Sequence, residues 1–171
     1  MEKGMGETVV IGESKFGRGI FTTTALPPDT VILKITGRPM SFRETVALGH
    51  HESHSMQIGL QDYILVEAPF LFSNHSCDPN CGINKDLEMI TIKTVAAGEE
   101  LTWDYSTSML ERHWTLKCHC GAAFCRGIVR DFDLIPLHIQ NKYLHYNIVL
   151  PFIIDAVKNP SWHQQEVFSV R

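Results

Sequence analysis

The stretch that decides the fold is Ser73-Asn74-His75-Ser76-Cys77-Asp78-Pro79-Asn80-Cys81. Pro79 excludes a continuing helix and restricts Asp78 to an extended conformation, while Asn and Asp side chains can bond nearby backbone groups. The local prediction is therefore a tight polar turn. An ordinary surface turn is the alternative, but apolar sequence runs up to the stretch at 64–66 and 70–72. We therefore expect this turn to lie at the edge of the core.

Length and composition are those of a folded chain. The 171 residues are 44% apolar and 20% charged, which predicts one domain with a sizeable core. A net charge of -4 argues against a broad phosphate-binding surface, so we expect no direct nucleic-acid ligand. The longest apolar stretch, residues 148–157, is interrupted by Pro151 and Asp155 and is too short to span a bilayer.

The amino-terminal residues bear on location. Residues 1–10 lack the basic start and the long apolar run of a signal peptide. We expect an intracellular protein, cytoplasmic or nuclear, that is not secreted and does not enter a membrane. The sequence carries no signal for the oligomeric state.

The periodicity of the chain predicts a mainly β fold with short helices. Short runs of β-branched and aromatic residues alternate with turn residues, which is typical of many short strands. The predicted strands are 8–11, 30–35, 55–58, 63–66, 82–84, 89–95 and 101–105. We expect a turn at 12–15, and we expect residues 37–39 to end the second strand.

Three short helices are also predicted. Ser41, with Glu44 three residues later, is typical of a capping box that begins a helix running towards Leu48. A second helix is expected over residues 136–146 and a third after Pro151, since proline is favoured in the first helical turn.

Three cysteines lie close together in the pattern Cys-x-Cys-x4-Cys, at Cys118, Cys120 and Cys125. An odd total of five cysteines without a secretion signal favours a metal site over disulfides. Structural zinc takes four soft ligands at about 2.3 Å, so a fourth ligand must come from elsewhere. The candidates are Cys77, Cys81, His113 and His119. The histidine-rich segment 50–54 is interpreted as an exposed loop rather than a second metal site.

Four motifs together carry a resemblance to a known family. They are G-R-G at 17–19, N-H-S-C-D-P-N at 74–80, G-E-E-L-T-W-D-Y at 98–105 and C-H-C…C-R-G at 118–127. Over residues 8–128, their order and spacing resemble those of SET-domain protein lysine methyltransferases with a post-SET zinc loop. The resemblance implies the SET-domain β-clip fold with its pseudoknot, in which the segment through Asn74 threads under a later loop.

The resemblance also implies an organisation and a function. We expect a SET domain at 1–107, a post-SET zinc loop at 108–130 and a C-terminal helical extension at 131–171. The implied cofactors are S-adenosylmethionine as methyl donor and one structural zinc ion. The implied partner is a protein or peptide lysine, on a histone or another basic protein. The compact chain resembles stand-alone members of the family.

The resemblance assigns roles residue by residue. The implied cofactor-binding residues are Phe16, Gly17, Arg18, Gly19, Asn74, His75 and Tyr105. Tyr105 is also the implied catalytic residue, at the channel through which the methyl group passes. The implied metal ligands are Cys77, Cys118, Cys120 and Cys125. Cys81 is then a strand residue at the core edge.

The implied chemistry explains why these residues are needed. Methyl transfer from a sulfonium to an amine is an in-line displacement, so alignment of the substrates is the main source of catalysis. The lysine must attack as a neutral amine although its free pKa is about 10.4, and an apolar channel disfavours the ammonium form. Strand alternation over 101–105 predicts that Trp103 and Tyr105 face opposite sides, with one of them at the reacting centre.

Three positions depart from the family pattern. Ile35 stands where many members have a tyrosine in the channel wall, and Leu71 where many have an arginine. Trp103 stands where a Phe or Tyr often influences how many methyl groups are added. Ile35 supports one alternative, a catalytically silent module that binds a peptide. A second alternative, a zinc-dependent interaction domain without a cofactor, leaves Asn74 and Tyr105 without a function.

Overall fold

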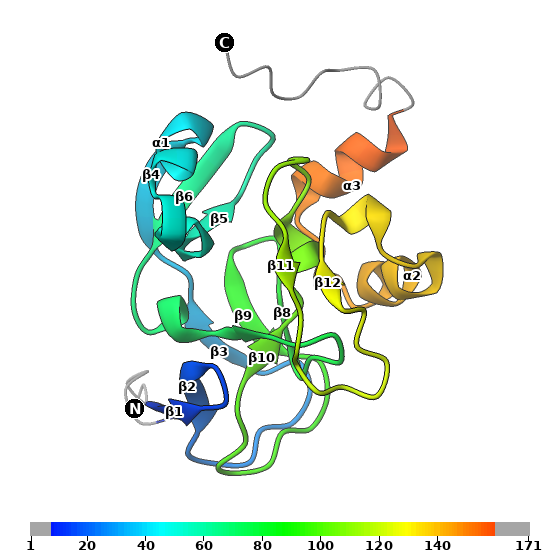
Figure 1. Ribbon diagram of the computed structural model, residues 1–171. Helices are drawn as coiled ribbons and strands as arrows, with labels where there is room; N and C mark the ends of the chain where they lie inside the picture. The colour runs from blue at the N-terminus through cyan, green and yellow to red at the C-terminus, as the bar shows by residue number, and fades with distance from the viewer. Residues whose placement is uncertain (1–7, 160–171) are drawn as a thin grey trace.

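The computed structural model describes residues 8–159 and shows several small β-sheets with helices on opposite sides of them (Figure 1). A hairpin joins β1 (Val9–Ser14) to β2 (Gly17–Thr22). Two three-stranded sheets have the strand orders β3-β9-β8 and β4-β6-β5. Their strands are β3 (Val31–Lys34), β4 (Gly37–Ser41), β5 (Ser55–Gln57), β6 (Asp62–Val66), β8 (Cys81–Ile83) and β9 (Glu88–Thr91). The prediction of a mainly β chain is confirmed.

Two further strand pairs are short. The strand β7 (Asn74–His75) runs parallel to β10 (Thr102–Trp103), and β11 (Leu116–Lys117) runs antiparallel to β12 (Ile128–Val129). The parallel pair joins the two segments that the expected pseudoknot brings together. Asn80 strengthens this crossing, because its side chain donates to the Glu100 carbonyl at 2.7 Å and accepts from the Thr102 N–H at 2.9 Å.

The helices form where the sequence predicts them. They are α1 (Phe42–Ala47), α2 (Leu137–His145) and α3 (Pro151–Lys158). The expected capping box begins α1, since the Ser41 hydroxyl accepts from the Glu44 N–H and the Glu44 carboxylate accepts from the Ser41 N–H at 2.8 Å. Short 3₁₀ helices span Gly49–His54, Phe70–Phe72, Tyr105–Ser108 and Phe132–Leu134. The first of these contains the histidine-rich segment, which was expected to be a loop.

One predicted turn and one predicted strand end were misplaced. The strand β1 continues to Ser14, so the chain reverses after that residue and not across 12–15. Residues 37–39 do not end a strand, because they belong to β4. This strand lies at the edge of its sheet. An edge strand tolerates proline, because it has no second neighbour to which the missing N–H would have to donate.

Apolar side chains form two adjoining cores. The main core lies between the sheets and includes Ile20, Ile83, Met89 and Leu101. The second core includes Leu110, Phe132, Tyr143, Ile148 and Ile153. The two meet closely at Gly82, where a Cβ atom would lie 2.4 Å from the side chain of Ile148.

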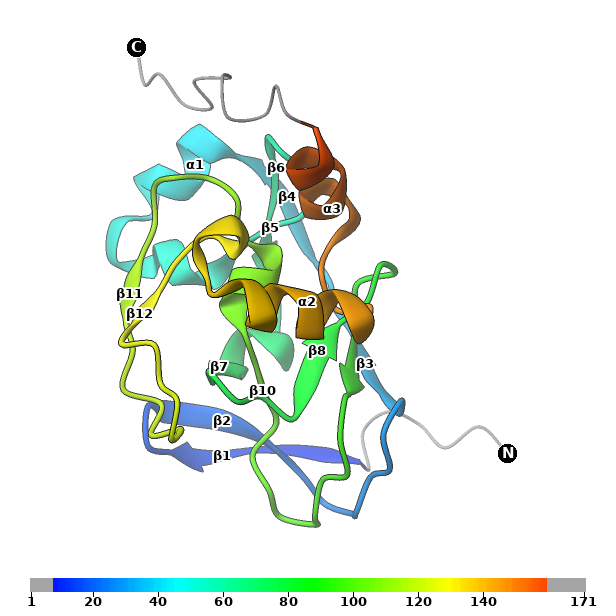
Figure 2. The ribbon, with the colours of Figure 1, turned by 90° about the vertical axis from the view of Figure 1, so that its right-hand side faces the viewer.

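The two C-terminal helices pack on the β structure as one layer. Figure 2 shows α2 and α3 on the same side of the molecule, with α2 next to β8. Their apolar residues belong to the second core, so they complete the fold instead of standing apart from it. Residues 160–171 of the predicted extension lie outside the described residues. Within residues 8–159, no helix has the length and apolar character needed to cross a membrane.

Candidate functional site

Asn74 on β7 links the amino-terminal hairpin to the centre of the molecule. Its side-chain nitrogen donates to the Arg18 carbonyl at 2.9 Å and to Glu100 Oε1 at 2.7 Å. Because both partners are acceptors, the amide nitrogen faces them and the amide oxygen points away from them. Asn74 therefore fixes β2 and still offers an acceptor to a ligand.

Two glycines shape the surface of β2, one next to solvent and one against Glu100. Gly17 has a φ of 101°, and a Cβ atom on it would have no neighbour within 4 Å. This conformation favours glycine, and the backbone here is open to a ligand. At Gly19, a Cβ atom would lie 2.4 Å from the Glu100 carboxylate, so the missing side chain lets β2 lie against that group.

The turn between β1 and β2 lies beside residues 118–127, which are called the cysteine loop below. Lys15 Nζ donates to the His119 carbonyl at 2.8 Å, although 104 positions separate them in the sequence. The Arg18 guanidinium lies 3.8 Å from the centroid of the Phe72 ring. Phe16, in the turn, is 47% exposed. The segment assigned to the cofactor by resemblance therefore borders both the polar turn and the cysteine loop.

Trp103 and Tyr105 line the same pocket. The strand β10 ends at Trp103, and Tyr105 begins a 3₁₀ helix in which the Asp104 carboxylate accepts from the Ser106 N–H at 3.1 Å. This change of backbone geometry interrupts the strand alternation, so the two rings lie 4.9 Å apart. The prediction that they face opposite sides was wrong, because residues 101–105 are not one continuous strand.

The Tyr105 hydroxyl is held in place by Ser73. It donates to the Ser73 carbonyl at 2.7 Å, while Trp103 Nε1 donates to the Ser73 hydroxyl at 3.0 Å. Burial, and then the Glu100 carboxylate, raise the pKa of Tyr105, so the hydroxyl is protonated at neutral pH. Since its proton is used in the bond to Ser73, the hydroxyl oxygen has lone pairs with which to accept a bond in the pocket.

A pocket of about 60 Å³ lies beside these two rings. Its walls are mostly aromatic and apolar, and within residues 8–159 its lining includes two carboxylates but no lysine or arginine. The lining residues that matter here are Glu52, Tyr63, Trp103, Tyr105, Glu111 and Trp114. Leu71 also lines the pocket, whereas Ile35 is buried in the main core and is not part of the wall. The pocket therefore suits a long apolar group that ends in a cation.

Tyr63 and Glu111 form a buried pair in this pocket that sequence reasoning missed. The Tyr63 hydroxyl donates to Glu111 Oε2 at 2.7 Å, and the Trp114 N–H donates to Glu111 Oε1 at 3.2 Å. Burial raises the pKa of Glu111, which is 5% exposed. The pair is 48 positions apart and neither member lies in a recognisable motif, so no sequence signal could have joined them.

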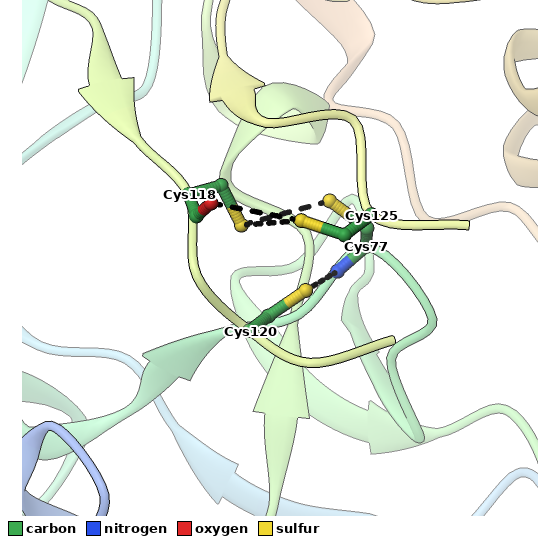
Figure 3. Close-up of side chains that lie close together, drawn as sticks. All are labelled: Cys77, Cys118, Cys120 and Cys125. Carbon is green, nitrogen blue, oxygen red and sulfur yellow. Dashed lines mark hydrogen bonds between the residues drawn. The ribbon is translucent and has the colours of Figure 1, made fainter. Parts of the chain in front are cut away.

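Four cysteine thiols converge in the structure, three from the cysteine loop and one from the polar turn (Figure 3). The sulfur atoms of Cys77, Cys118, Cys120 and Cys125 all lie within 4.8 Å of one another. The sulfur of Cys118 lies 3.8 Å from that of Cys77 and 3.5 Å from that of Cys125. Four thiolates on a tetrahedral zinc would be about 3.8 Å apart, so the cluster can hold this metal.

The other candidates for a fourth ligand lie elsewhere. Cys81 is fully buried in the main core at the start of β8. His113 Nε2 lies 2.8 Å from the Glu52 carboxylate, and His119 is not among the residues of the thiol cluster. Of the four residues that the sequence left open, the structure brings Cys77 to the cluster.

The ionisation of the thiols differs within the cluster. Burial is the main reason that the pKa of Cys77 is raised to about 11. Burial opposes ionisation of Cys120 as well, but the backbone N–H groups of Cys77 and Ala122 lower its pKa to about 7. Cys120 therefore supplies a thiolate, the form that binds a metal, more readily than Cys77 does.

His75 connects the thiol cluster to Tyr105. Its Nδ1 accepts from the Tyr105 N–H at 3.3 Å, and its Nε2 lies 3.3 Å from Cys77 Sγ. Burial lowers the pKa of His75 to about 4, so the ring is neutral at physiological pH. Because Nδ1 accepts, Nε2 carries the single ring proton and donates it to the sulfur.

Asp104 is a second connection between distant parts of the chain. Its carboxylate accepts from the Arg126 guanidinium at 2.7 and 2.8 Å and from the Tyr143 hydroxyl at 2.8 Å. Arg126 directly follows Cys125, and Tyr143 lies in α2. The cysteine loop, through Arg126, and α2, through Tyr143, therefore both hold Asp104, the residue that precedes Tyr105.

Comparison with known proteins identifies the family to which most of these segments belong. The SET domain family matches residues 17–106. Histone-lysine N-methyltransferase SETD2 from human and from mouse is 31% identical over 136 residues, which cover 70% of this chain and 5% of the relative. Histone-lysine N-methyltransferase ash1 from Drosophila melanogaster is 25% identical over 129 residues, or 66% of this chain and 6% of the relative. The chain thus spans about a twentieth of the length of these relatives.

Proposed function

The chain belongs to the SET-domain family, and on this premise we propose that it is a protein-lysine N-methyltransferase that uses S-adenosylmethionine. The observation that carries the proposal is the pocket that Tyr105 and Trp103 line together with two carboxylates. Aromatic walls and negative groups suit the apolar stem and the ammonium head of a lysine. The proposed substrate is a lysine of a histone or another basic protein.

The proposed cofactor site lies between β2, β7 and the cysteine loop. Its residues are Phe16, Gly17, Arg18, Gly19, Asn74, His75 and Tyr105. Two observations fit the cofactor: the open backbone at Gly17, and the amide oxygen of Asn74, which can accept from an ammonium group. When bound, S-adenosylmethionine supplies a methyl group activated by a sulfonium. The neutral ring of His75 adds no charge beside this cation.

Tyr105 is the proposed catalytic residue. Its hydroxyl oxygen can accept a hydrogen bond from the lysine amine and so direct the nitrogen lone pair. Such alignment is the main contribution that a protein makes to an in-line displacement. Trp103 packs against Tyr105 and limits the space around the amine.

The proposed metal is one structural zinc ion bound by Cys77, Cys118, Cys120 and Cys125. Two donors outside the ligand set support the Cys77 sulfur, namely the His75 ring and the Arg126 N–H, the latter at 3.4 Å. Such donors commonly orient thiolate ligands and stabilise their charge. The metal has no proposed contact with the reacting atoms.

The proposed organisation is a SET domain at 1–107, a post-SET zinc loop at 108–130 and a C-terminal helical extension at 131–171. The end of the family match at residue 106 supports the first boundary. A protein partner, without direct contact to nucleic acid or membrane, and a cytoplasmic or nuclear location complete the proposal.

The test is incubation with labelled S-adenosylmethionine and a panel of histones and cell-lysate proteins, followed by mass spectrometry. We expect methyllysine on at least one basic protein, and none with heat-inactivated enzyme. Calorimetric titration with S-adenosylmethionine accompanies the assay. A protein that binds the cofactor but methylates nothing would be the silent peptide-binding module. One that neither binds the cofactor nor methylates would be either that module or a zinc-dependent interaction domain.

A further inference from the structure

The pocket contains a buried carboxylate to which no step of the reaction has been assigned so far. Glu111 is 5% exposed and lines the same pocket as Tyr105. One of its oxygens accepts from the Tyr63 hydroxyl and the other from the Trp114 N–H. Since each carboxylate oxygen has two lone pairs, both oxygens retain capacity for a donor that enters the pocket.

The proposed reaction needs a group that accepts a proton. A lysine with a free pKa of about 10.4 arrives as an ammonium ion but must attack as an amine. Tyr105 does not serve as the acceptor, because its hydroxyl is protonated and donates to the Ser73 carbonyl. Glu52, the other carboxylate of the pocket, faces His113 Nε2 at 2.8 Å. Glu111 is the more deeply buried of these two carboxylates, and each of its oxygens retains a lone pair for a donor in the pocket.

We propose, on the basis of the function proposed above, that Glu111 binds the ammonium group of the target lysine and accepts one of its protons. An N–H bond of the ammonium breaks and an O–H bond forms on the carboxylate, which gives a neutral amine and a neutral carboxylic acid. The nitrogen lone pair would then form the new N–C bond while the S–C bond of the methyl donor breaks, and the electron pair of that bond would pass to the sulfur. The carboxylic acid returns its proton to water before the next turnover.

The surroundings of Glu111 suit a group that gains and loses a proton. Burial is the largest influence and raises the pKa of Glu111, and Asp131 raises it as well. The Tyr63 hydroxyl, the Trp114 N–H and His113 act in the opposite direction. The titratable or charged groups around the carboxylate are Glu52, Tyr63, His113, Asp131 and Arg112, the partner of Asp131. A carboxyl group shifted towards neutral pH is a more effective proton acceptor than one in water.

The test is the pH dependence of kcat/KM for a lysine peptide with the full chain and its Glu111→Gln variant. In the wild type, the rate should fall as the pH drops through the raised pKa of Glu111 and should be level above it. The variant should lose on the order of 10²-fold at neutral pH. Its rate should then rise about tenfold per pH unit towards the pKa of free lysine, because it depends on amine already neutral in solution.

A peptide with thialysine, whose amine has a lower pKa, provides a rescue experiment. The Glu111→Gln variant should methylate this peptide much faster than it methylates the lysine peptide. The wild type should methylate the two peptides at similar rates. Glu52→Gln is the matched control, since it removes the same charge from the same pocket. This control should raise KM for the peptide but keep the shape of the wild-type pH profile.

A second variant keeps the inference testable if Glu111→Gln does not fold. Tyr63→Phe removes a hydrogen bond that favours the ionised form of Glu111, so the acid limb of the profile should move to higher pH. Calorimetric binding of S-adenosylmethionine verifies that each variant is folded.

The outcomes separate this inference from the proposed function. A wild type that produces no methyllysine overturns both. A wild type that methylates lysine overturns the role of Glu111 alone if Glu111→Gln keeps the wild-type pH profile. The same holds if Glu52→Gln shows the same upward slope, because the effect would then come from pocket charge in general.

Discussion

Replacing Arg126 with methionine removes the positive partner of a fully buried carboxylate. Two guanidinium N–H groups donate to Asp104 at 2.7 and 2.8 Å, and the side chain of Asp104 is 0% exposed. Methionine retains much of the apolar stem, so the change is mainly electrostatic. Asp104 keeps its bonds from the Tyr143 hydroxyl at 2.8 Å and the Ser106 N–H at 3.1 Å.

The expected loss of stability follows from the charge that remains. Removing one member of a buried ion pair destabilises proteins by about 3–5 kcal/mol, because the other charge stays buried without compensation. We expect a value near the lower end, roughly 3 kcal/mol, since Arg126 is 11% exposed and Asp104 keeps two donors. In a chain of this size, such a loss lowers the melting temperature by about 6–12 °C.

Thermal unfolding followed by circular dichroism measures this loss. Adding Asp104→Asn to the Arg126→Met variant should recover part of it, because the buried charge is then gone. Arg38→Met is the matched control, since Arg38 and its partner Glu44 are 58% and 54% exposed and 3.6 Å apart. The control should melt close to the wild type. Equal melting temperatures for the two single variants, or no recovery in the double variant, would refute the argument.

Three further predictions concern the site. Tyr105→Phe should still bind S-adenosylmethionine but lose on the order of 10²-fold or more in turnover, and near-normal turnover would exclude the hydroxyl from the mechanism. Asn74→Ala should weaken binding of S-adenosylmethionine by roughly 1–3 kcal/mol in calorimetric titration, whereas equal affinities would make the residue purely structural. Elemental analysis should find one zinc per chain, and Cys120→Ser or chelation should abolish methyl transfer while most of the far-ultraviolet dichroism remains. Cys77→Ser should behave in the same way and Cys81→Ser should not. Normal methylation by metal-free protein would contradict the prediction that methyl transfer requires the zinc ion.

The local elements of the fold were predictable because their causes lie within a few residues. Ser41 and Glu44 form the capping box of α1, and Pro151 occupies the first turn of α3. The place of Pro39 was not predictable in this way. A proline ends a central strand but is tolerated in an edge strand, and the sequence does not show that β4 lies at an edge.

The candidate site shows the same limit. The motif around Asn74 indicates a site because its residues are adjacent in the sequence. Strand alternation gave the wrong orientation for Trp103 and Tyr105, since the chain leaves the strand at Asp104 and enters a 3₁₀ helix. The pocket carboxylate Glu111 lies outside the strands and is bonded to Tyr63 in β6, so the pair could be found only once the fold was known.

Tyr105 is held by parts of the chain that lie far apart in sequence. Its hydroxyl is bonded to the Ser73 carbonyl, its backbone N–H to His75, and the residue before it is paired with Arg126. His75 in turn contacts the sulfur of Cys77, and Arg126 follows the last cysteine of the loop. A metal that draws the four sulfur atoms together would therefore fix both the backbone and the neighbour of Tyr105 without contacting a substrate. The cysteine loop would then act on catalysis through orientation, which is the property on which an in-line methyl transfer most depends.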